Sequence, residues 1–238
     1  NATMVLKGNS SKAENWNLLG NSYLAPIDAA TMLNEIKVKG DENAAGIELS
    51  ISIYDAAVGE ANSYLTASYA TLTEEGNKPF TVIPPMNAFF MNLKSMNEAG
   101  FTIDYANCVW NQDPISTQAM YAPKRSATAT CNIKLSVTAE GLADRVILRE
   151  SDDFTSAFDN GYEASKMMND EMNLYVNSDA PMAELATDNL DGTHLSFQAG
   201  NAVEYTMTFN NRNNDNFVLV DNLTNAQVAM TDGATYTF

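Results

Sequence analysis

The sequence predicts an all-β protein, an antiparallel β-sandwich of the jelly-roll-like kind. Apolar and polar residues alternate along many short segments, turn-forming residues separate these segments, and stretches with helical periodicity are few and short. Alternation gives a strand one apolar and one polar face, which is typical of antiparallel sheets with one face on a core and one in water. Because no long helices alternate with the strands, a parallel sheet is not expected.

The clearest strand is predicted over residues 47–53. Its apolar face consists of Ile47, Leu49, Ile51 and Ile53, and its polar face of Glu48, Ser50 and Ser52. We expect the apolar face to lie in a core and Glu48 and Ser50 to lie in water. The same alternation predicts strands over 133–137 and 203–209. Further strands are predicted over residues 64–72, 80–83, 88–93, 101–110, 145–149, 195–198, 217–220 and 235–238.

Two short helices are predicted, over residues 28–36 and 163–168. In the first, Asp28 is a suitable N-cap. The apolar side of that helix consists of Met32, Leu33 and Ile36. Neither helix is long enough to connect parallel strands, which supports stacked antiparallel sheets.

The chain length allows one large β domain or two smaller ones. Hydrophobic alternation lapses over residues 121–126, where Pro123 is followed by Lys124 and Arg125, and a new strand pattern begins after them. We therefore predict two packed sandwich modules, an N-terminal one over 1–123 and a C-terminal one over 124–238. A single sandwich with an exposed loop at this place explains the same composition.

The charge balance makes some partners unfavourable. Thirteen Lys and Arg stand against thirty Asp and Glu, a formal net charge of −17. Such a chain repels phosphate backbones and anionic lipid surfaces, so we expect neither nucleic-acid binding nor a membrane partner. No run of about 18 apolar residues is present, so membrane insertion is not expected either. The first residues contain no signal peptide, and a chain that begins without Met is expected to be either a processed or a recombinantly trimmed form.

The two cysteines, Cys108 and Cys131, do not have the paired spacing of a zinc site. They lie in two different predicted strands or strand-like stretches. A disulfide between them is expected if the protein folds outside the cytoplasm, whereas a core of this size is also stable with two buried thiols. Both alternatives stay open at the level of the sequence.

No catalytic residue is predicted. His194 is the only histidine, it lies between a turn and a strand, and no nucleophile motif accompanies it. The carboxylate pairs Asp152–Asp153 and Asp170–Glu171 consist of sequence neighbours, whose side chains diverge on a strand or a helix. A hydrolase that works with two carboxylates is therefore the least favoured alternative.

Two loops are rich in oxygen ligands that suit calcium, residues 188–192 and 210–216. The weak candidate ligands are Asp188, Asp191 and Asp215. Neither loop has the EF-hand spacing, and ordinary polar turns explain both. No other cofactor is expected.

Three aromatic residues are weak candidates for a ligand site. Trp16, Trp110 and Tyr121 are large enough to stack on a sugar ring, as aromatic side chains commonly do at binding surfaces. The same residues are equally suited to packing in a core.

Several segments resemble exported surface proteins of the Bacteroidota, in the order in which those proteins have them. Residues 16–28, WNLLGNSYLAPID, resemble the signature W-N-L-I-G-N-P-Y-P-x-x-I-D, and residues 82–91, VIPPMNAFFM, resemble I-P-P-x-Q-G-F-F-V with Asn87-Ala88 in place of Gln-Gly. In the second half, DRVIL at 144–148 precedes FDNGYEASK at 158–166, which is similar to F-D-x-G-Y-D-A-x-K. Residues 218–225 and 236–238 look like the L-x-D-x-x-T-G and Y-x-F strands.

The resemblance implies a β-sandwich region of an adhesin-like protein associated with type IX secretion, a region that normally precedes a sorting domain. It implies a non-catalytic secreted or cell-surface structural or adhesion module, located outside the cell or at the outer-membrane surface. Its partner would be an extracellular protein or a glycan. The alternative function is a calcium-assisted, carbohydrate-binding β-sandwich module. The resemblance brings no catalytic residues to this sequence.

Overall fold

The computed structural model describes residues 2–8, 15–39, 46–55, 63–74, 78–94, 99–110, 131–213 and 216–238. Strands make up 47% of the described residues and helices 11%, so the all-β, sandwich-like fold is confirmed. The chain divides into two compact units. Unit 1 comprises residues 1–54, 65–127 and 160–164, and unit 2 comprises 55–64, 128–159 and 165–238. The expected module boundary at residue 123 lies within 111–130, outside the described residues.

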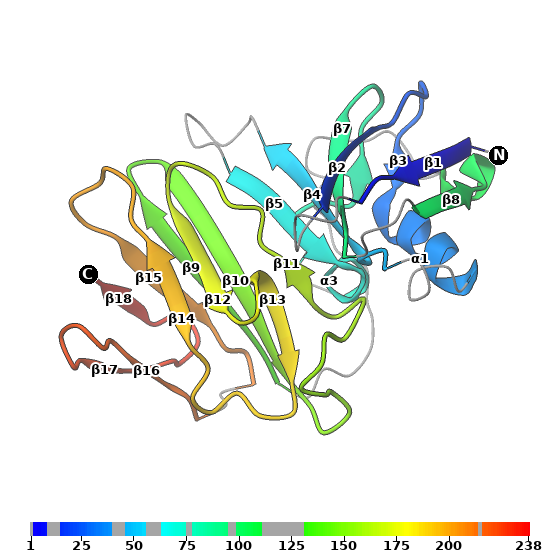
Figure 1. Ribbon diagram of the computed structural model, residues 1–238. Helices are drawn as coiled ribbons and strands as arrows, with labels where there is room; N and C mark the ends of the chain where they lie inside the picture. Colours follow the sequence, from blue (N-terminus) through cyan, green and yellow to red (C-terminus); the bar gives the residue numbers. More distant parts are fainter. Residues whose placement is uncertain are drawn as a thin grey trace. The chain divides into compact units, whose positions relative to one another are not determined.

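Unit 1 contains a four-stranded sheet with the order β2–β7–β4–β5 (Figure 1). Its strands are β2 (Asn15–Gly20), β7 (Ala88–Leu93), β4 (Ser50–Asp55) and β5 (Ser63–Ser68). Two further antiparallel pairs belong to this unit, β1 with β8 and β3 with β6. These strands are β1 (Ala2–Leu6), β8 (Ala99–Ile103), β3 (Ile27–Asp28) and β6 (Val82–Ile83). The predicted strand at 88–93 is confirmed residue for residue.

Helix α1 (Ala29–Lys39) confirms the first predicted helix and its cap. The Thr31 amide donates a 2.7 Å hydrogen bond to Asp28 Oδ1, which satisfies one of the free amides of the first turn. The three residues of the predicted apolar side, Met32, Leu33 and Ile36, are all buried in the core of unit 1.

The predicted exposure of Glu48 and Ser50 is wrong. Ile47, Leu49 and Ile51 are buried as expected, but Glu48, Ser50 and Ser52 are also at most 1% exposed. The Glu48 carboxylate accepts hydrogen bonds from Ser50 Oγ (2.6 Å) and Asn92 Nδ2 (3.0 Å), and Ser52 Oγ lies 2.8 Å from Thr66 Oγ1. Period-two alternation separates two faces, but it does not say whether the polar face is covered.

Two predicted strands end early in short helices. The segment 64–72 changes from β5 to α3 (Tyr69–Thr73) because Ser68 Oγ accepts from the Thr71 amide and caps a helix. The segment 101–110 changes from β8 to α4 (Tyr105–Cys108) behind the N-cap Asp104. The predicted helix at 163–168 is wrong, since β11 (Ala164–Ser165) occupies that place and pairs with a strand of unit 2.

Unit 2 is built on a large sheet that curls into a half barrel (Figure 1). Its strand order is β14–β12–β13–β10–β9–β15–β18, with β11 paired to β13. The strands are β9 (Cys131–Ala139), β10 (Leu142–Glu150), β12 (Asn173–Asn177), β13 (Pro181–Thr187), β14 (Leu195–Gln198), β15 (Thr206–Asn210) and β18 (Thr235–Thr237). Neighbouring strands are antiparallel except β10 and β13, which are parallel.

The longest hairpin of unit 2 joins β9 to β10 through two residues, Glu140 and Gly141. Both have positive φ, 48° and 86°, as a two-residue type I′ turn requires. A separate hairpin is formed by β16 (Val218–Val220) and β17 (Gln227–Ala229). The predicted strand over 203–209 begins late, at Thr206, and Val203 is 96% exposed.

The inward faces of the strands contribute to both cores, and the helices contribute as well to the core of unit 1. In unit 2, Ile133, Leu135 and Val137 of β9 pack with Met207 and Phe209 of β15, as the alternation predicts. Within the described part of the chain, no helix is both long and apolar enough to pass through a membrane.

Candidate functional site

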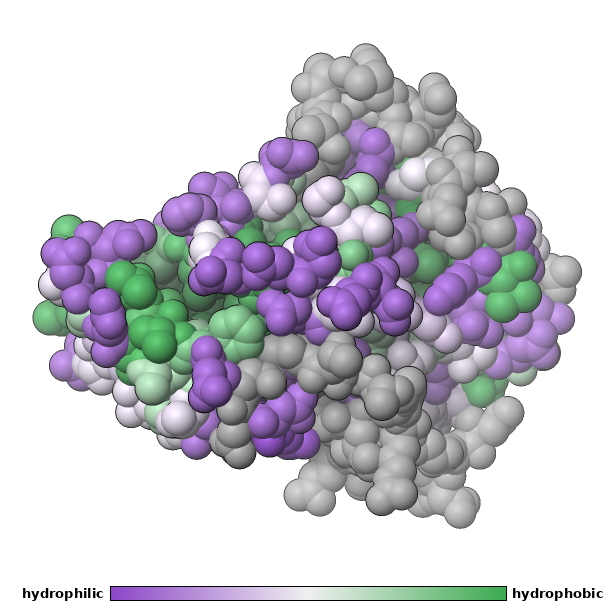
Figure 2. Space-filling view, turned by 90° about the horizontal axis from the view of Figure 1, so that it is seen from below, coloured by the Kyte–Doolittle hydropathy of each residue, from purple (hydrophilic) through white to green (hydrophobic). Residues whose placement is uncertain are grey.

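A groove of about 690 Å³ lies beside the β16–β17 hairpin of unit 2. This volume lies within the range of ligand pockets, roughly 300–1,000 Å³. Its apolar lining consists of Ile133, Leu148, Leu190, Leu195, Phe217, Val218, Leu219, Val220 and Met230. Figure 2 shows hydrophobic residues gathered on the left of the view, in the part of unit 2 that carries this hairpin, with hydrophilic residues around them.

The hairpin that forms one wall of the groove is fixed by its own turn. Asp221 Oδ2 accepts hydrogen bonds from Tyr236 Oη (2.7 Å) and Thr224 Oγ1 (2.8 Å), and Oδ1 accepts from the Leu223 amide (2.8 Å). These hydrogen bonds lower the pKa of Asp221 to about 2, and the one from Tyr236 has the largest effect. Asn225 has a φ of 61°, in the left-handed region that favours glycine.

Strand β16 presents an apolar outer face at the groove. Leu219 packs against the core of unit 2, whereas Val218 and Val220 on either side of it are 54% and 49% exposed. All three line the groove. The wall is therefore an anchored strand with two exposed aliphatic side chains, which is a surface suited to binding rather than one needed for folding.

The opposite wall contains Asp191 and His194, two residues that were singled out for different reasons. Both are exposed. The loop that carries them is held by Glu150, whose Oε2 accepts a 2.6 Å hydrogen bond from the Leu190 amide. Within the loop, Asn189 Oδ1 accepts from the Asp191 amide, and Gly192 has a φ of 77°.

The loop residues are explained by turn formation. Asp188 is exposed, and its Oδ1 is 3.3 Å from Thr187 Oγ1. Among the described residues, no group of three or more His, Cys, Asp or Glu side chains is arranged to hold a metal ion. The third calcium candidate, Asp215, lies outside the described residues.

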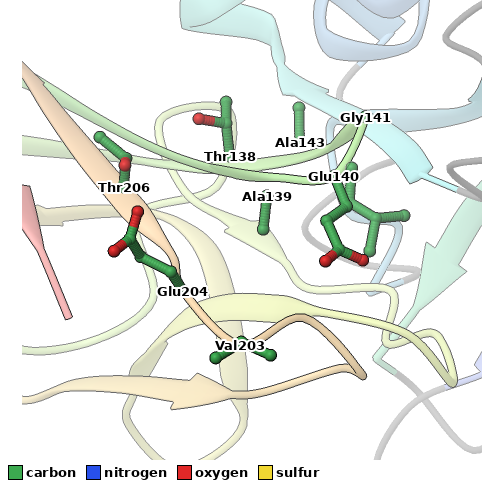
Figure 3. A pocket seen from close by; sticks show the side chains of 9 residues that line it. Thr138, Ala139, Glu140, Gly141, Ala143, Val203, Glu204 and Thr206 are labelled. Carbon is green, nitrogen blue, oxygen red and sulfur yellow. The ribbon is translucent and has the colours of Figure 1, made fainter.

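A second, shallower cavity of about 630 Å³ lies at the β9–β10 turn (Figure 3). The Glu140 side chain enters it from the turn, and the Glu204 side chain enters it from the segment before β15. Its other labelled residues are Thr138, Ala139, Gly141, Ala143, Val203 and Thr206. Leu142 also lines this cavity, and apolar and polar groups contribute about equally to its surface.

Two of the three aromatic candidates, Trp16 and Trp110, lie in unit 1 and are half-buried. Trp16 lies on β2 opposite Asn92, and the Trp110 amide donates to Pro26 O at 3.0 Å. Tyr121 lies outside the described residues. An aromatic contact that the sequence analysis missed is the stack of Tyr23 on Tyr105, with ring centroids 3.7 Å apart.

Cys108 is a free, fully buried thiol in the core of unit 1. The pKa of the Cys108 thiol is raised to about 11, and burial is the largest cause of the rise. The side chain of Cys131, its proposed disulfide partner, lies outside the described residues.

The segments that carry the family resemblance have structural roles in unit 2. Asp144 pairs with Lys166, and both side chains are 5% exposed. The same carboxylate accepts from the amides of Leu174 (2.6 Å) and Arg145 (2.8 Å). Burial lowers the pKa of Lys166, and the attraction of Asp144 opposes that effect. The DRVIL and FDNGYEASK segments are thus joined by a buried ion pair.

The same segments also stabilise unit 1. Asn160 Nδ2 donates to Ile47 O (2.9 Å), and Asn160 Oδ1 accepts from the Leu49 amide (2.8 Å). The side-chain amide of Asn160 thereby pairs with the backbone of Ile47 and Leu49 as a neighbouring strand would. Asn21 of the WNLLGN segment is buried, and its Nδ2 lies 3.1 Å from the carbonyl oxygens of Ile83 and Pro84.

Sequence reasoning identified Asp191 and His194 but did not identify the groove that they share. The missing part was the β16–β17 hairpin, whose place beside β9 and β10 depends on tertiary packing. A usable signal was present, since an Asp-x-x-Thr turn follows an uninterrupted Val-Leu-Val strand. Comparison with protein-family models, curated proteins and solved structures gave no match for this chain.

Proposed function

We propose that this chain is a non-catalytic, extracellular adhesion module that binds a partner through the groove of unit 2. The observation that carries the proposal is the wall of the groove. Val218 and Val220 expose aliphatic surface on a strand whose neighbour Leu219 is anchored in the core. Exposed aliphatic residues next to a concave apolar lining are typical of interaction sites.

The roles of the remaining motif residues support a binding scaffold. Asp144, Lys166, Asn160 and Asn21 are engaged in hydrogen bonds that connect strands and loops. A scaffold whose shared segments build the architecture leaves its loops and hairpins to determine the partner. The resemblance to exported surface proteins adds the extracellular location to this proposal.

The test is a panel of purified extracellular proteins and glycans, immobilised and probed with the labelled chain. The groove variant is the double substitution Val218→Ser and Val220→Ser, which removes exposed methyl groups without touching the core. The matched control is Leu223→Ser, because Leu223 belongs to the same hairpin and is 91% exposed but does not line the groove.

We expect saturable binding of the wild-type chain to at least one panel member. The groove variant should lose that binding by about tenfold, which corresponds to about 1.4 kcal/mol, and the control should keep it. Binding that is equally strong in the groove variant would contradict the proposal, as would a panel member that the chain converts chemically.

A further inference from the structure

One wall of the groove is the marginal strand β16, and the other is the loop of residues 190–194 that leads into the marginal strand β14. Leu195 begins β14, which is the terminal strand of the eight-stranded sheet, and Val218 to Val220 form β16 of the two-stranded hairpin. Both line the groove. A marginal strand offers its backbone amides and carbonyls to an added strand, and exposed side chains beside it select alternate side chains of that strand. The shape of the groove therefore suits an extended chain.

The surface charge of unit 2 is almost entirely negative. Its described cationic residues are Lys134, Arg145, Arg149, Lys166 and Arg212. Arg149 and Lys166 are buried and paired with Glu184 and Asp144, and only Arg212 is exposed. Nine described acidic residues are exposed: Glu140, Asp152, Asp153, Asp170, Asp179, Asp188, Asp191, Glu204 and Asp232. One of them, Asp191, lies at the groove itself.

From this charge complementarity we infer that the groove of unit 2 binds an extended peptide segment in which Lys or Arg alternates with apolar residues. The inference rests on the proposed binding function and names the chemistry of the partner. Alternate side chains of an added strand lie on opposite faces, so the apolar side chains of the segment pack beside Val218 and Val220 on one face, while its cationic side chains lie on the other face, toward Asp191 and the surrounding negative field.

A second copy of this chain is a poorer occupant, because two molecules with a net charge of −17 repel each other. A neutral glycan gains nothing from the negative field. Among the described residues that line the groove, Phe217 is the one Phe, Tyr or Trp, and it packs against the core of unit 2, so the aliphatic wall offers no exposed aromatic platform to a sugar. These two occupants remain outcomes of the test.

The experiment uses fluorescence anisotropy with the full chain and three labelled peptides of about eight residues, roughly 26 Å long when extended. In the first peptide Lys alternates with Leu, in the second Glu replaces Lys, and in the third Ser replaces Leu. The protein variants are the Val218→Ser and Val220→Ser double variant with its control Leu223→Ser, and Asp191→Asn with its control Asp188→Asn from the same loop.

We expect the Lys–Leu peptide to bind, and to bind more weakly as salt rises from about 20 to about 500 mM. The double variant should lose about tenfold in affinity and Asp191→Asn about twofold to fivefold, while both controls keep the wild-type affinity. The Glu–Leu and Lys–Ser peptides should bind at least about tenfold more weakly than the Lys–Leu peptide.

The inference is overturned if the Lys–Leu peptide does not bind, if its binding is equal in the double variant, or if the Lys–Ser peptide binds as tightly. Groove-dependent capture of a glycan in the panel, or groove-dependent dimerisation in sedimentation at low salt, would also overturn it. If the chain binds a member of the panel, loses that binding in the double variant and does not bind the Lys–Leu peptide, the adhesion function stands and only the peptide inference is wrong. If the double variant binds the panel member as tightly as the wild type, the proposed function itself is contradicted.

Discussion

Asp144 is the buried carboxylate that connects the most segments of unit 2. Its carboxylate accepts hydrogen bonds from Lys166 Nζ and from the amides of Leu174 and Arg145. These donors belong to three segments, namely β10, β12 and the residues that follow β11, which therefore meet at one side chain. A buried ion pair contributes little net stability relative to two apolar residues, but removal of one partner leaves the other charge buried and unpaired.

We therefore predict that Asp144→Asn lowers the free energy of unfolding by about 3–5 kcal/mol, measured by urea denaturation. Asp152→Asn, at an exposed acidic residue, should change it by less than about 0.5 kcal/mol. Adding Lys166→Met to Asp144→Asn should recover part of the loss, because no unpaired charge remains. A single variant as stable as the wild type would show that the pair does not form.

Glu48 illustrates what a residue's sequence position does not reveal. Its alternation with Ile47 and Leu49 correctly placed it on the opposite face, but that face is buried as well. The partners that make burial tolerable, Asn92 and Ser50, include one residue 44 positions away. Whether a buried carboxylate such as that of Glu48 finds hydrogen-bond donors depends on how its segment pairs with β7. The sequence of one strand does not contain that information.

At the scale of elements, the ends of strands were harder to predict than their centres. The predicted strands include the centres of β7, β9 and β10, whereas β5 and β8 stop where Ser68 and Asp104 cap short helices. Strand-like and helix-like residues adjoin there, and a single capping hydrogen bond decides between them. The groove was not predictable for the related reason that it requires β16 to pack beside distant strands.

The turn at Gly161 sets the course of the chain beside β4. Gly161 has a φ of +92°, and its carbonyl accepts from the Ala70 amide at 2.8 Å. A Cβ atom there would lie 3.5 Å from Leu49 Cδ1. We predict that Gly161→Ala costs about 1–2 kcal/mol of unfolding free energy, chiefly through the positive φ.

The matched control for this prediction is Gly20→Ala. Gly20 lies in β2 without a positive φ, and a Cβ atom there would meet nothing within 4 Å. Denaturant unfolding of the two variants should differ by about 1 kcal/mol or more. Equal stability would mean that the turn relaxes when the side chain is added.

The hairpin turn at Asp221 gives a pH-dependent prediction. Its pKa of about 2 is below the usual 3.8, because Tyr236, Thr224 and backbone amides donate to the carboxylate. The unfolded chain therefore takes up this proton first, and the stabilisation that is complete above about pH 4 is lost as the pH falls towards 2. Carboxyl NMR titration measures the pKa directly.

Tyr236→Phe removes the first cause of this shift and should raise the pKa of Asp221 towards its usual value. Asp221→Asn should abolish the corresponding part of the acid dependence of unfolding. If the pKa of Asp221 is the same in the Tyr236→Phe variant, the hydrogen bond between these side chains does not hold the turn.

At the scale of the whole molecule, the net negative charge opposes folding, because folding brings residues of like charge closer together. The chain has thirty acidic and thirteen basic residues, and the basic residues Arg149 and Lys166 are used in buried pairs. The composition alone predicted the net charge of −17, but which cations remain at the surface followed only from the structure. The proposed binding of a cationic peptide depends on the negative field of the exposed acidic residues. The same field lowers the stability of the folded chain, because like charges repel.

We therefore predict that the chain becomes more stable as sodium chloride rises from about 10 to about 300 mM, because screening weakens the repulsion among its acidic residues. A gain of about 1 kcal/mol corresponds to a rise in Tm of roughly 2–4 °C for a chain of this size. Most of the rise should occur at the low end of the range, where the Debye length shortens fastest. A rise that continues in proportion to concentration up to about 1 M would instead indicate that the salt is excluded from the surface, and the charge argument would then be wrong.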